Sequence, residues 1–196
     1  ITYLANGRIY LLSEKANEQG SLDMGCAPDI LPGYRPVAYP EFRKKCENVW
    51  HTELSDKPGL NLFEMVDAAE KGSLKAVYVM GENPLCNIPN SGRVEAAFRK
   101  LDFLVVQDIF LTETAKLADV VLPALSWAEK DGTFTNMERR IQRVRKSVHR
   151  EGMEDWKIIA EISKNMGYSM DYKGAEDLFH EATKVSPLHR DLTYED

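Results

Sequence analysis

The stretch KAVYVMGENPLCNIPN, Lys75–Asn90, decides the fold class. An apolar run, Ala76–Met80, is followed at once by the polar sequence Gly-Glu-Asn-Pro. A short apolar run that stops at a turn containing Gly and Pro is typical of a buried strand. The sequence therefore predicts a strand over residues 76–80 with a polar loop at its carboxyl end.

The same pattern recurs twice along the chain. Apolar runs at 103–107 and 119–123 predict two more strands, and amphipathic segments at 91–101 and near 112–117 predict the helices between them. Continuous apolar strands that alternate with such helices indicate a parallel sheet covered on both faces. The predicted fold class is therefore α/β, a Rossmann-like three-layer αβα arrangement with a mainly parallel sheet, plus a hairpin and long loop excursions.

Periodicity and turn residues assign the flanking segments. Residues 16–37 are dense in Gly, Pro, Asn and Asp, which predicts a long loop. The other expected elements are a short strand at Ile9–Leu12, helices at 40–50, 60–74, 155–167 and 175–183, a hairpin joining GTFTN to RRIQRV, and a frayed end after the last helix. The predicted domains are a leading strand and long loop segment (1–57), an α/β domain (58–170) and a tail with one helix (171–196).

Composition and charge exclude some classes of protein. The chain has 196 residues, 43% of them hydrophobic, which suits one globular domain with or without appendages. Its formal net charge of −6 gives no basic footprint for nucleic acid. The basic run Arg139–Arg150 has two interpretations, a solvated hairpin face or a patch that meets phosphates or an acidic neighbour.

The three cysteines, Cys26, Cys46 and Cys86, are far apart and form no Cys-x-x-Cys pair. This spacing specifies neither a zinc site nor an iron–sulfur site, and it is typical of thiols in a reducing compartment. We therefore expect a cytoplasmic protein. No apolar run approaches about 18 residues, so no membrane span is expected. The chain does not start with Met, and we expect an internal fragment of a longer protein.

Four polar residues lie at or just after the predicted strand ends: Asn83, Asn87, Gln107 and Asp108. Ligands of open parallel sheets bind outside the carboxyl ends of the strands, where these residues would share one rim. Amides supply donors and acceptors together, which suits a purine edge or ribose hydroxyls. The alternative is that they cap helices and turns. The fingerprint Gly-x-Gly-x-x-Gly is absent, so ordinary NAD or FAD binding is not favoured.

Two charged residues downstream are further candidates. Lys130 precedes a turn and either meets a phosphate or is a solvated lysine. Asp155 starts a predicted helix, where a carboxylate either caps the helix or accepts from the N1 and N2 hydrogens of guanine.

Several longer strings carry a resemblance to a known family. They are ANEQGSLDMGCAPDILPGY, VYVMGENPL, LDFLVVQDIFLTETAKLADVVLPALSWAEKDGTFTNMERRIQRVRK and DWKIIAEISKNMGY. In this order they resemble the molybdopterin oxidoreductases of the dimethyl-sulfoxide-reductase superfamily, in particular the formate dehydrogenase catalytic (alpha) subunits.

The resemblance implies a cofactor, partners and site residues. Members carry molybdenum or tungsten on two molybdopterin guanine dinucleotides, usually with an N-terminal [4Fe-4S] cluster, and formate members oxidise formate to carbon dioxide. Expected partners are the remainder of the catalytic subunit and iron–sulfur or electron-accepting subunits, but no nucleic acid. The cofactor-binding positions of the family, carried over one by one, are Asn83, Asn87, Gln107, Asp108, Lys130 and Asp155.

The sequence also departs from the family. It lacks the cluster cysteines, the metal-ligating cysteine or selenocysteine and the C-terminal β-rich domain, so this chain should hold no catalytic residue and be inactive alone. Ser13 stands where the formate enzymes have an arginine, which leaves the substrate open. The alternative is an electron-transfer or scaffold domain related to the large iron–sulfur subunit of complex I, without bound pterin.

Overall fold

The computed structural model describes residues 14–195, and tertiary contacts divide the chain into two units. The sheet unit comprises residues 60–130 and 146–171, and the hairpin unit comprises residues 1–59, 131–145 and 172–196. The expected strand Ile9–Leu12 and Ser13 lie outside the described residues.

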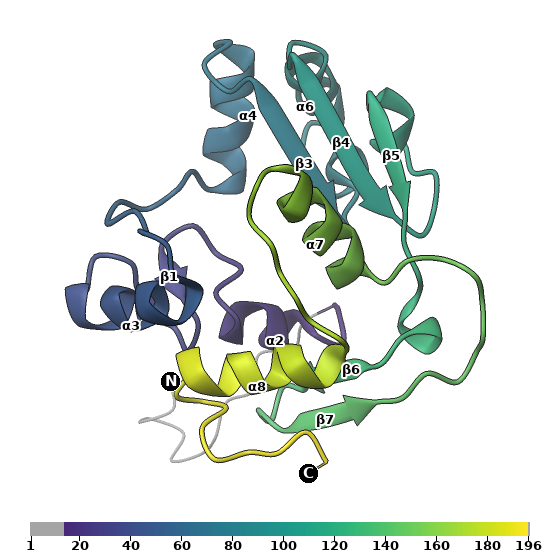
Figure 1. Cartoon of the computed structure of the whole chain (residues 1–196). Coiled ribbons are helices and arrows are strands. Elements are labelled where there is room, and N and C mark those ends of the chain that lie inside the picture. Colours follow the sequence, from purple (N-terminus) through teal and green to yellow (C-terminus); the bar gives the residue numbers. More distant parts are fainter. Residues whose placement is uncertain (1–13, 196) are drawn as a thin grey trace, which may run out of the picture. The chain divides into compact units, whose positions relative to one another are not determined.

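The sheet unit is built on three parallel strands (Figure 1). They are β3 (Ala76–Met80), β4 (Phe103–Asp108) and β5 (Val120–Pro123), in the order β3-β4-β5. Met80 pairs with Gln107, and Asp108 pairs with Pro123, so the three carboxyl ends meet at one edge. The predicted α/β class and parallel sheet are confirmed.

One face of this sheet carries the core. Helices α4 (Leu62–Glu70), α5 (Pro84–Asn87) and α6 (Ser91–Phe98) supply apolar side chains to it. The buried cluster consists of Val66, Ala69, Val79, Leu85, Ile88, Val94, Ala97, Phe98, Leu104, Val106 and Ala115. Its helical members recur every three or four residues and its strand members alternate, as a helix-on-sheet interface requires.

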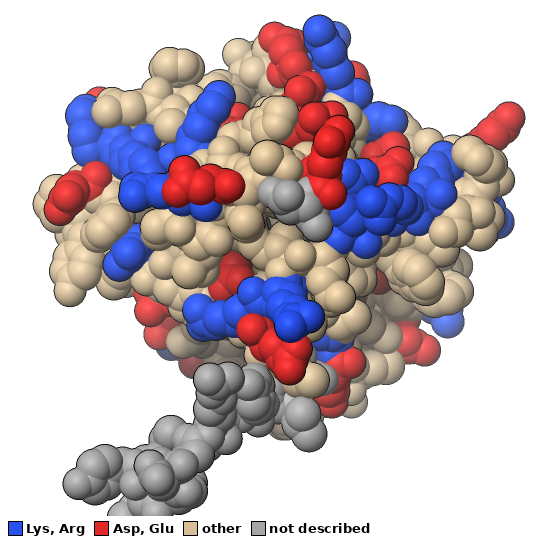
Figure 2. Space-filling model, turned by 90° about the horizontal axis from the view of Figure 1, so that it is seen from below, with Lys and Arg blue, Asp and Glu red and all other residues tan. Residues whose placement is uncertain are grey.

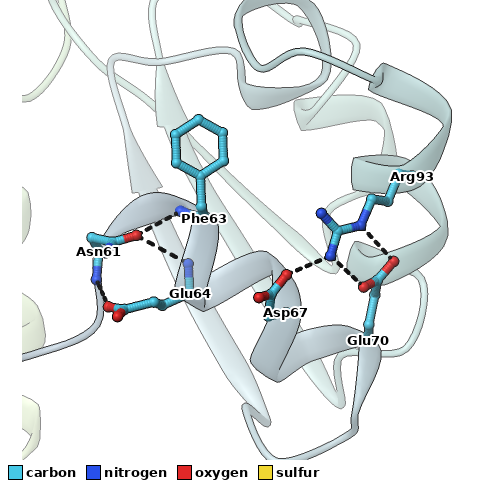
Figure 3. Close-up of polar contacts among 6 residues, drawn as sticks. All are labelled: Asn61, Phe63, Glu64, Asp67, Glu70 and Arg93. Atoms are coloured by element: carbon cyan, nitrogen blue, oxygen red, sulfur yellow. Dashed lines mark hydrogen bonds and ion pairs between the residues drawn. The ribbon is translucent and has the colours of Figure 1, made fainter.

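Polar contacts fix the start of α4 and join it to α6 (Figure 3). Asn61 accepts from the backbone of Phe63 and Glu64, and the Glu64 carboxylate accepts from the Asn61 N–H, which is a complete capping box. On α6, Arg93 forms ion pairs with Asp67 and Glu70 of α4. These contacts set the boundary and orientation of the helix pair behind the sheet.

The other face of the sheet keeps apolar side chains exposed. Tyr78, Met80, Phe103 and Val120 lie on this face by strand register and are between 38% and 49% exposed. Helix α7 (Asp155–Asn165) lies in front of this face in Figure 1 and buries Ile158. A parallel sheet is normally covered on both faces, so the apolar area that α7 leaves exposed on this face is unusual.

The remaining elements of the sheet unit are single 3₁₀ turns, η1 (Ala115–Leu117) and η2 (Trp127–Glu129). The helix expected near 112–117 is thus the short turn η1. Thr114, the residue before η1, is polar and fully buried. Its burial is tolerated because the Asn83 side chain accepts hydrogen bonds from both the N–H and the hydroxyl of Thr114.

Among its described residues, the hairpin unit contains short strands and three helices. Strands β6 (Gly132–Thr135) and β7 (Ile141–Val144) form the predicted antiparallel hairpin. The helices and remaining strands are α2 (Glu18–Asp23), β1 (Ile30–Leu31), β2 (Arg35–Pro36), α3 (Pro40–Trp50) and α8 (Ala175–Val185). The hairpin belongs by contacts to this unit, whereas the sequence placed it within 58–170, and those domain limits stay a prediction.

Two expectations for this unit were wrong. Residues 16–37 are not all loop, because α2 forms there, Asp23 at its end is 2% exposed, and Gln19 donates to the Tyr34 hydroxyl over 3.0 Å. The chain after α8 is not frayed as far as Glu195, because Tyr194 is buried against Phe179. Neither of these tertiary contacts can be predicted from the local composition of the sequence.

Candidate functional site

Gln107 is the second-to-last residue of β4 and is fully buried. Its Nε2 donates to Asp155 Oδ1 over 2.7 Å, and its Oε1 accepts from the Tyr78 hydroxyl. Because both halves of the amide are engaged, the orientation of this side chain is fixed. A polar side chain without exposure requires such partners.

Asp155 also forms an ion pair with Lys130, through Oδ2 and Nζ. Each of these two side chains is 27% exposed. Asp155 is the first residue of α7, where the positive end of the helix dipole favours a carboxylate. Tyr78, Gln107, Lys130 and Asp155 therefore form one connected set at the carboxyl edge of the sheet, called here the edge network.

The Tyr78 hydroxyl is kept protonated by its surroundings. Burial raises its pKa, and the negative charge of Asp155 raises it further. Tyr78 thus remains a hydrogen-bond donor to Gln107 throughout the physiological pH range.

The other three predicted site residues make separate contacts. Asn83 donates to Glu113 over 2.8 Å, in addition to its contacts with Thr114. Asn87 donates to Glu82, and the Asp108 carboxylate accepts from the N–H of Phe110 over 2.9 Å. Asn83 lies on the loop after β3, Asn87 ends α5 and Asp108 ends β4, all three outside the edge network.

The backbone brings the two loops together even so. The N–H of Gly81, which has a φ of +62°, donates to the carbonyl oxygen of Gln107 over 2.9 Å. The loop after β3 therefore starts beside the end of β4. A positive φ of this kind favours glycine.

A pocket of about 370 Å³ lies beyond the ends of β4 and β5. Ile109, Phe110, Ser126, Glu129 and Arg150 contribute to its lining, and Phe110 is 72% exposed. The backbone N–H and hydroxyl of Ser126 hold the pKa of Glu129 below its usual value. Sequence reasoning missed this pocket, although the apolar pair after Asp108 in a surface loop was the signal that could have found it.

Tyr78 was also missed as a site residue, because an aromatic residue within an apolar run reads as core. Among residues 14–195, no group of three or more His, Cys, Asp and Glu side chains is placed to hold a metal ion. Nor is any helix there both long and apolar enough to cross a membrane.

Comparison with known proteins gives a family match. A family described as "Molybdopterin oxidoreductase" matches residues 4–165. The F420-dependent formate dehydrogenase subunit alpha of Methanocaldococcus jannaschii is 51% identical over 182 residues, covering 91% of this chain and 27% of that protein. F420-dependent formate dehydrogenase 1 subunit alpha of Methanococcus maripaludis is 46% identical over 183 residues, with the same two coverages, 91% and 27%. The chain thus spans about a quarter of the length of these relatives.

A solved structure supports the fold. Acetylene hydratase from Pelobacter acetylenicus superposes with a TM-score of 0.58 at 21% sequence identity, covering 81% of this chain and 23% of that one. At this level of identity the likeness concerns the arrangement of helices and strands alone.

Proposed function

The chain belongs to the molybdopterin oxidoreductase family, and we propose that its sheet unit binds one nucleotide of a molybdopterin guanine dinucleotide. The longer protein would be a formate-dehydrogenase-like molybdenum or tungsten oxidoreductase, since its relatives include formate dehydrogenase alpha subunits. The observation that carries this proposal is the edge network at the carboxyl ends of the parallel strands.

The edge network fits a guanine base. A carboxylate has about four lone-pair directions, and Gln107 and Lys130 use two of those on Asp155. The remaining lone pairs on this partly exposed carboxylate can accept from N1–H and N2–H of guanine. Gln107 and Lys130 fix the orientation of the carboxylate beforehand, which reduces the entropy lost on binding.

Lys130 and the three candidate residues outside the edge network suit the rest of a nucleotide. We propose that Lys130 approaches a phosphate, and that Asp108, Asn83 and Asn87 approach the ribose hydroxyls or the base. Asn87 is exposed, Asn83 and Asn87 belong to the segment that follows β3, and Asp108 is the last residue of β4. When bound, the dinucleotide would supply a ligand for the metal at which two-electron chemistry takes place.

Further properties belong to the longer protein and are part of this proposal. It would oxidise formate to carbon dioxide, carry a [4Fe-4S] cluster, work with electron-accepting subunits and reside in the cytoplasm. The relatives are named as alpha subunits, which supports the presence of other subunits. The 196-residue chain would be inactive alone, because it spans about a quarter of the length of these relatives.

One observation favours a second candidate, an electron-transfer or scaffold domain without pterin. Lys130 already has its charge balanced by Asp155, and Gln107 already has partners at both ends. A structural role alone would also account for such a closed network.

Titration of the ¹⁵N-labelled chain with free molybdopterin guanine dinucleotide separates the two candidates. We expect shifts at the side-chain amide of Gln107 and the backbone amides of Asp108 and Asp155, and none at the exposed amide of Gln142 on β7. Unmoved signals at all three positions, with the fold intact, would refute nucleotide binding. Metal analysis of the full-length protein is the second arm, since iron without molybdenum or tungsten would favour the scaffold.

A further inference from the structure

A groove of about 590 Å³ runs beside β7 within the hairpin unit. Its lining includes four arginines and two leucines of the tail after α8, namely Arg139, Arg140, Arg143, Arg145, Leu188 and Leu192. Figure 2 shows the face of the molecule seen from below, where Lys and Arg side chains gather in groups. The six residues are called the arginine groove.

The arginine groove has an excess of positive charge. From Met137 to Arg145 the sequence has four arginines and one acidic residue, Glu138, in a chain whose net charge is −6. Glu138 lies 3.7 Å from Arg140, and both side chains are well exposed. An exposed pair of this kind is weak and exchanges readily with another carboxylate.

Arg143 is held in place from one side and lacks a partner on another. Its guanidinium lies 3.5 Å from the centre of the Tyr194 ring, and Nη1 donates to the Tyr194 carbonyl oxygen. Its Nε is buried and has no hydrogen-bond acceptor among residues 14–195. A buried donor without an acceptor costs stability, so a ligand that supplied an acceptor would be favoured there.

The leucines give the arginine groove an apolar component. Leu188 and Leu192 are 38% and 37% exposed, and they line the same groove as the arginines. A groove that offers both guanidinium groups and aliphatic side chains suits a polypeptide that carries both carboxylates and apolar side chains. A phosphate or a membrane headgroup would use the arginines but not the leucines.

We propose that the arginine groove docks an acidic, extended segment of a partner protein. Its Asp and Glu carboxylates would pair with the exposed arginines in the fork geometry that guanidinium prefers, and its apolar side chains would cover Leu188 and Leu192. Charge complementarity of this kind mainly accelerates association and selects the partner. The inference goes beyond the proposed nucleotide site and does not depend on it, since every residue involved lies in the hairpin unit.

The test uses the full-length protein that contains this chain. The probe is a fluorescein-labelled peptide of three Glu-Leu-Asp-Glu repeats, and its comparison peptide has Gln and Asn in place of the acids. Binding is followed by fluorescence anisotropy at low and high salt. The variant is Arg140→Gln with Arg145→Gln, and the matched control is Lys71→Gln with Arg99→Gln, which removes the same charge from exposed positions of the sheet unit.

We expect the acidic peptide to bind the unaltered protein and the control equally, and to bind the groove variant about tenfold more weakly. The uncharged peptide should bind the unaltered protein no better than the acidic peptide binds the groove variant. The affinity of the acidic peptide for the unaltered protein should fall as the salt concentration rises. Hydrogen exchange should show protection at 141–144 and 188–192 in the presence of the acidic peptide.

Three results would overturn the proposal. One is equal affinity of the groove variant and the control for the acidic peptide. Another is no binding of the peptide at all. The third is displacement of the bound acidic peptide by inorganic phosphate or by phosphatidylglycerol vesicles at concentrations too low for the unlabelled peptide to displace it. The groove would then select phosphate. Dinucleotide binding is read out separately at Gln107, so failure of one proposal is distinguishable from failure of the other.

Discussion

Replacement of Gln107 by leucine should destabilise the chain, although leucine is apolar and close in size. Gln107 is fully buried and makes one hydrogen bond with the neutral Tyr78 hydroxyl and one with the Asp155 carboxylate. A neutral hydrogen bond contributes about 1 kcal/mol and a charged one about 2 kcal/mol. Tyr78 and Asp155 are partly exposed, so water compensates for part of the loss. We expect a net loss of about 2 kcal/mol.

Urea unfolding followed by far-UV circular dichroism measures this loss. With a slope of about 2 kcal/mol per M of urea, the midpoint should fall by about 1 M. The control is Gln142→Leu, an exposed glutamine on a strand of the hairpin unit, for which we expect almost no shift. A Gln107→Leu midpoint equal to that of the unaltered chain would refute the reasoning, because the edge network would then contribute nothing beyond side-chain volume.

Four further predictions follow from local geometry. Asn61→Ala removes the capping box of α4 and should lower the free energy of unfolding by about 1 kcal/mol in urea titrations. Arg93→Ala breaks exposed ion pairs, so its small destabilisation should disappear at about 1 M salt, and a loss unchanged by salt would contradict this. Burial lowers the pKa of His189, so the unfolded chain protonates first and stability should fall as pH drops below about 6.5, a slope that His189→Phe should flatten. The uncovered face of the sheet should cause self-association, and sedimentation as a strict monomer at high concentration would argue against it.

The parallel sheet could be predicted because its signal is local. Each strand is an apolar run followed by a turn, and Val79, Leu104 and Val106 are buried as that pattern indicates. The helices α4, α6 and α7 followed from apolar residues at helical spacing. Hydrophobic periodicity reports which side of an element is buried, and here burial and secondary structure agree.

The rest depended on contacts between distant residues. Helix α2 contains Gly20 and Ser21, which are poor helix formers, and Asn17 at its start accepts from the N–H of Thr135, 118 positions away. The pairing of Gln107 with Asp155 joins residues 48 positions apart, and no local pattern reveals it. Of the candidate site, the sequence therefore predicted the shared edge and its members, but not which of them contact one another.

The order of segments along the chain has a consequence for synthesis. The sheet unit is discontinuous, because residues 131–145 of the hairpin unit interrupt it. During translation β3, β4 and β5 emerge before α7, so the Gln107 amide must wait for Asp155 while a segment of the other unit is made. A nascent chain halted before Asp155 would lack α7, so the apolar sheet face with Tyr78 and Met80 would be fully open, and exposed apolar surface is what chaperones recognise.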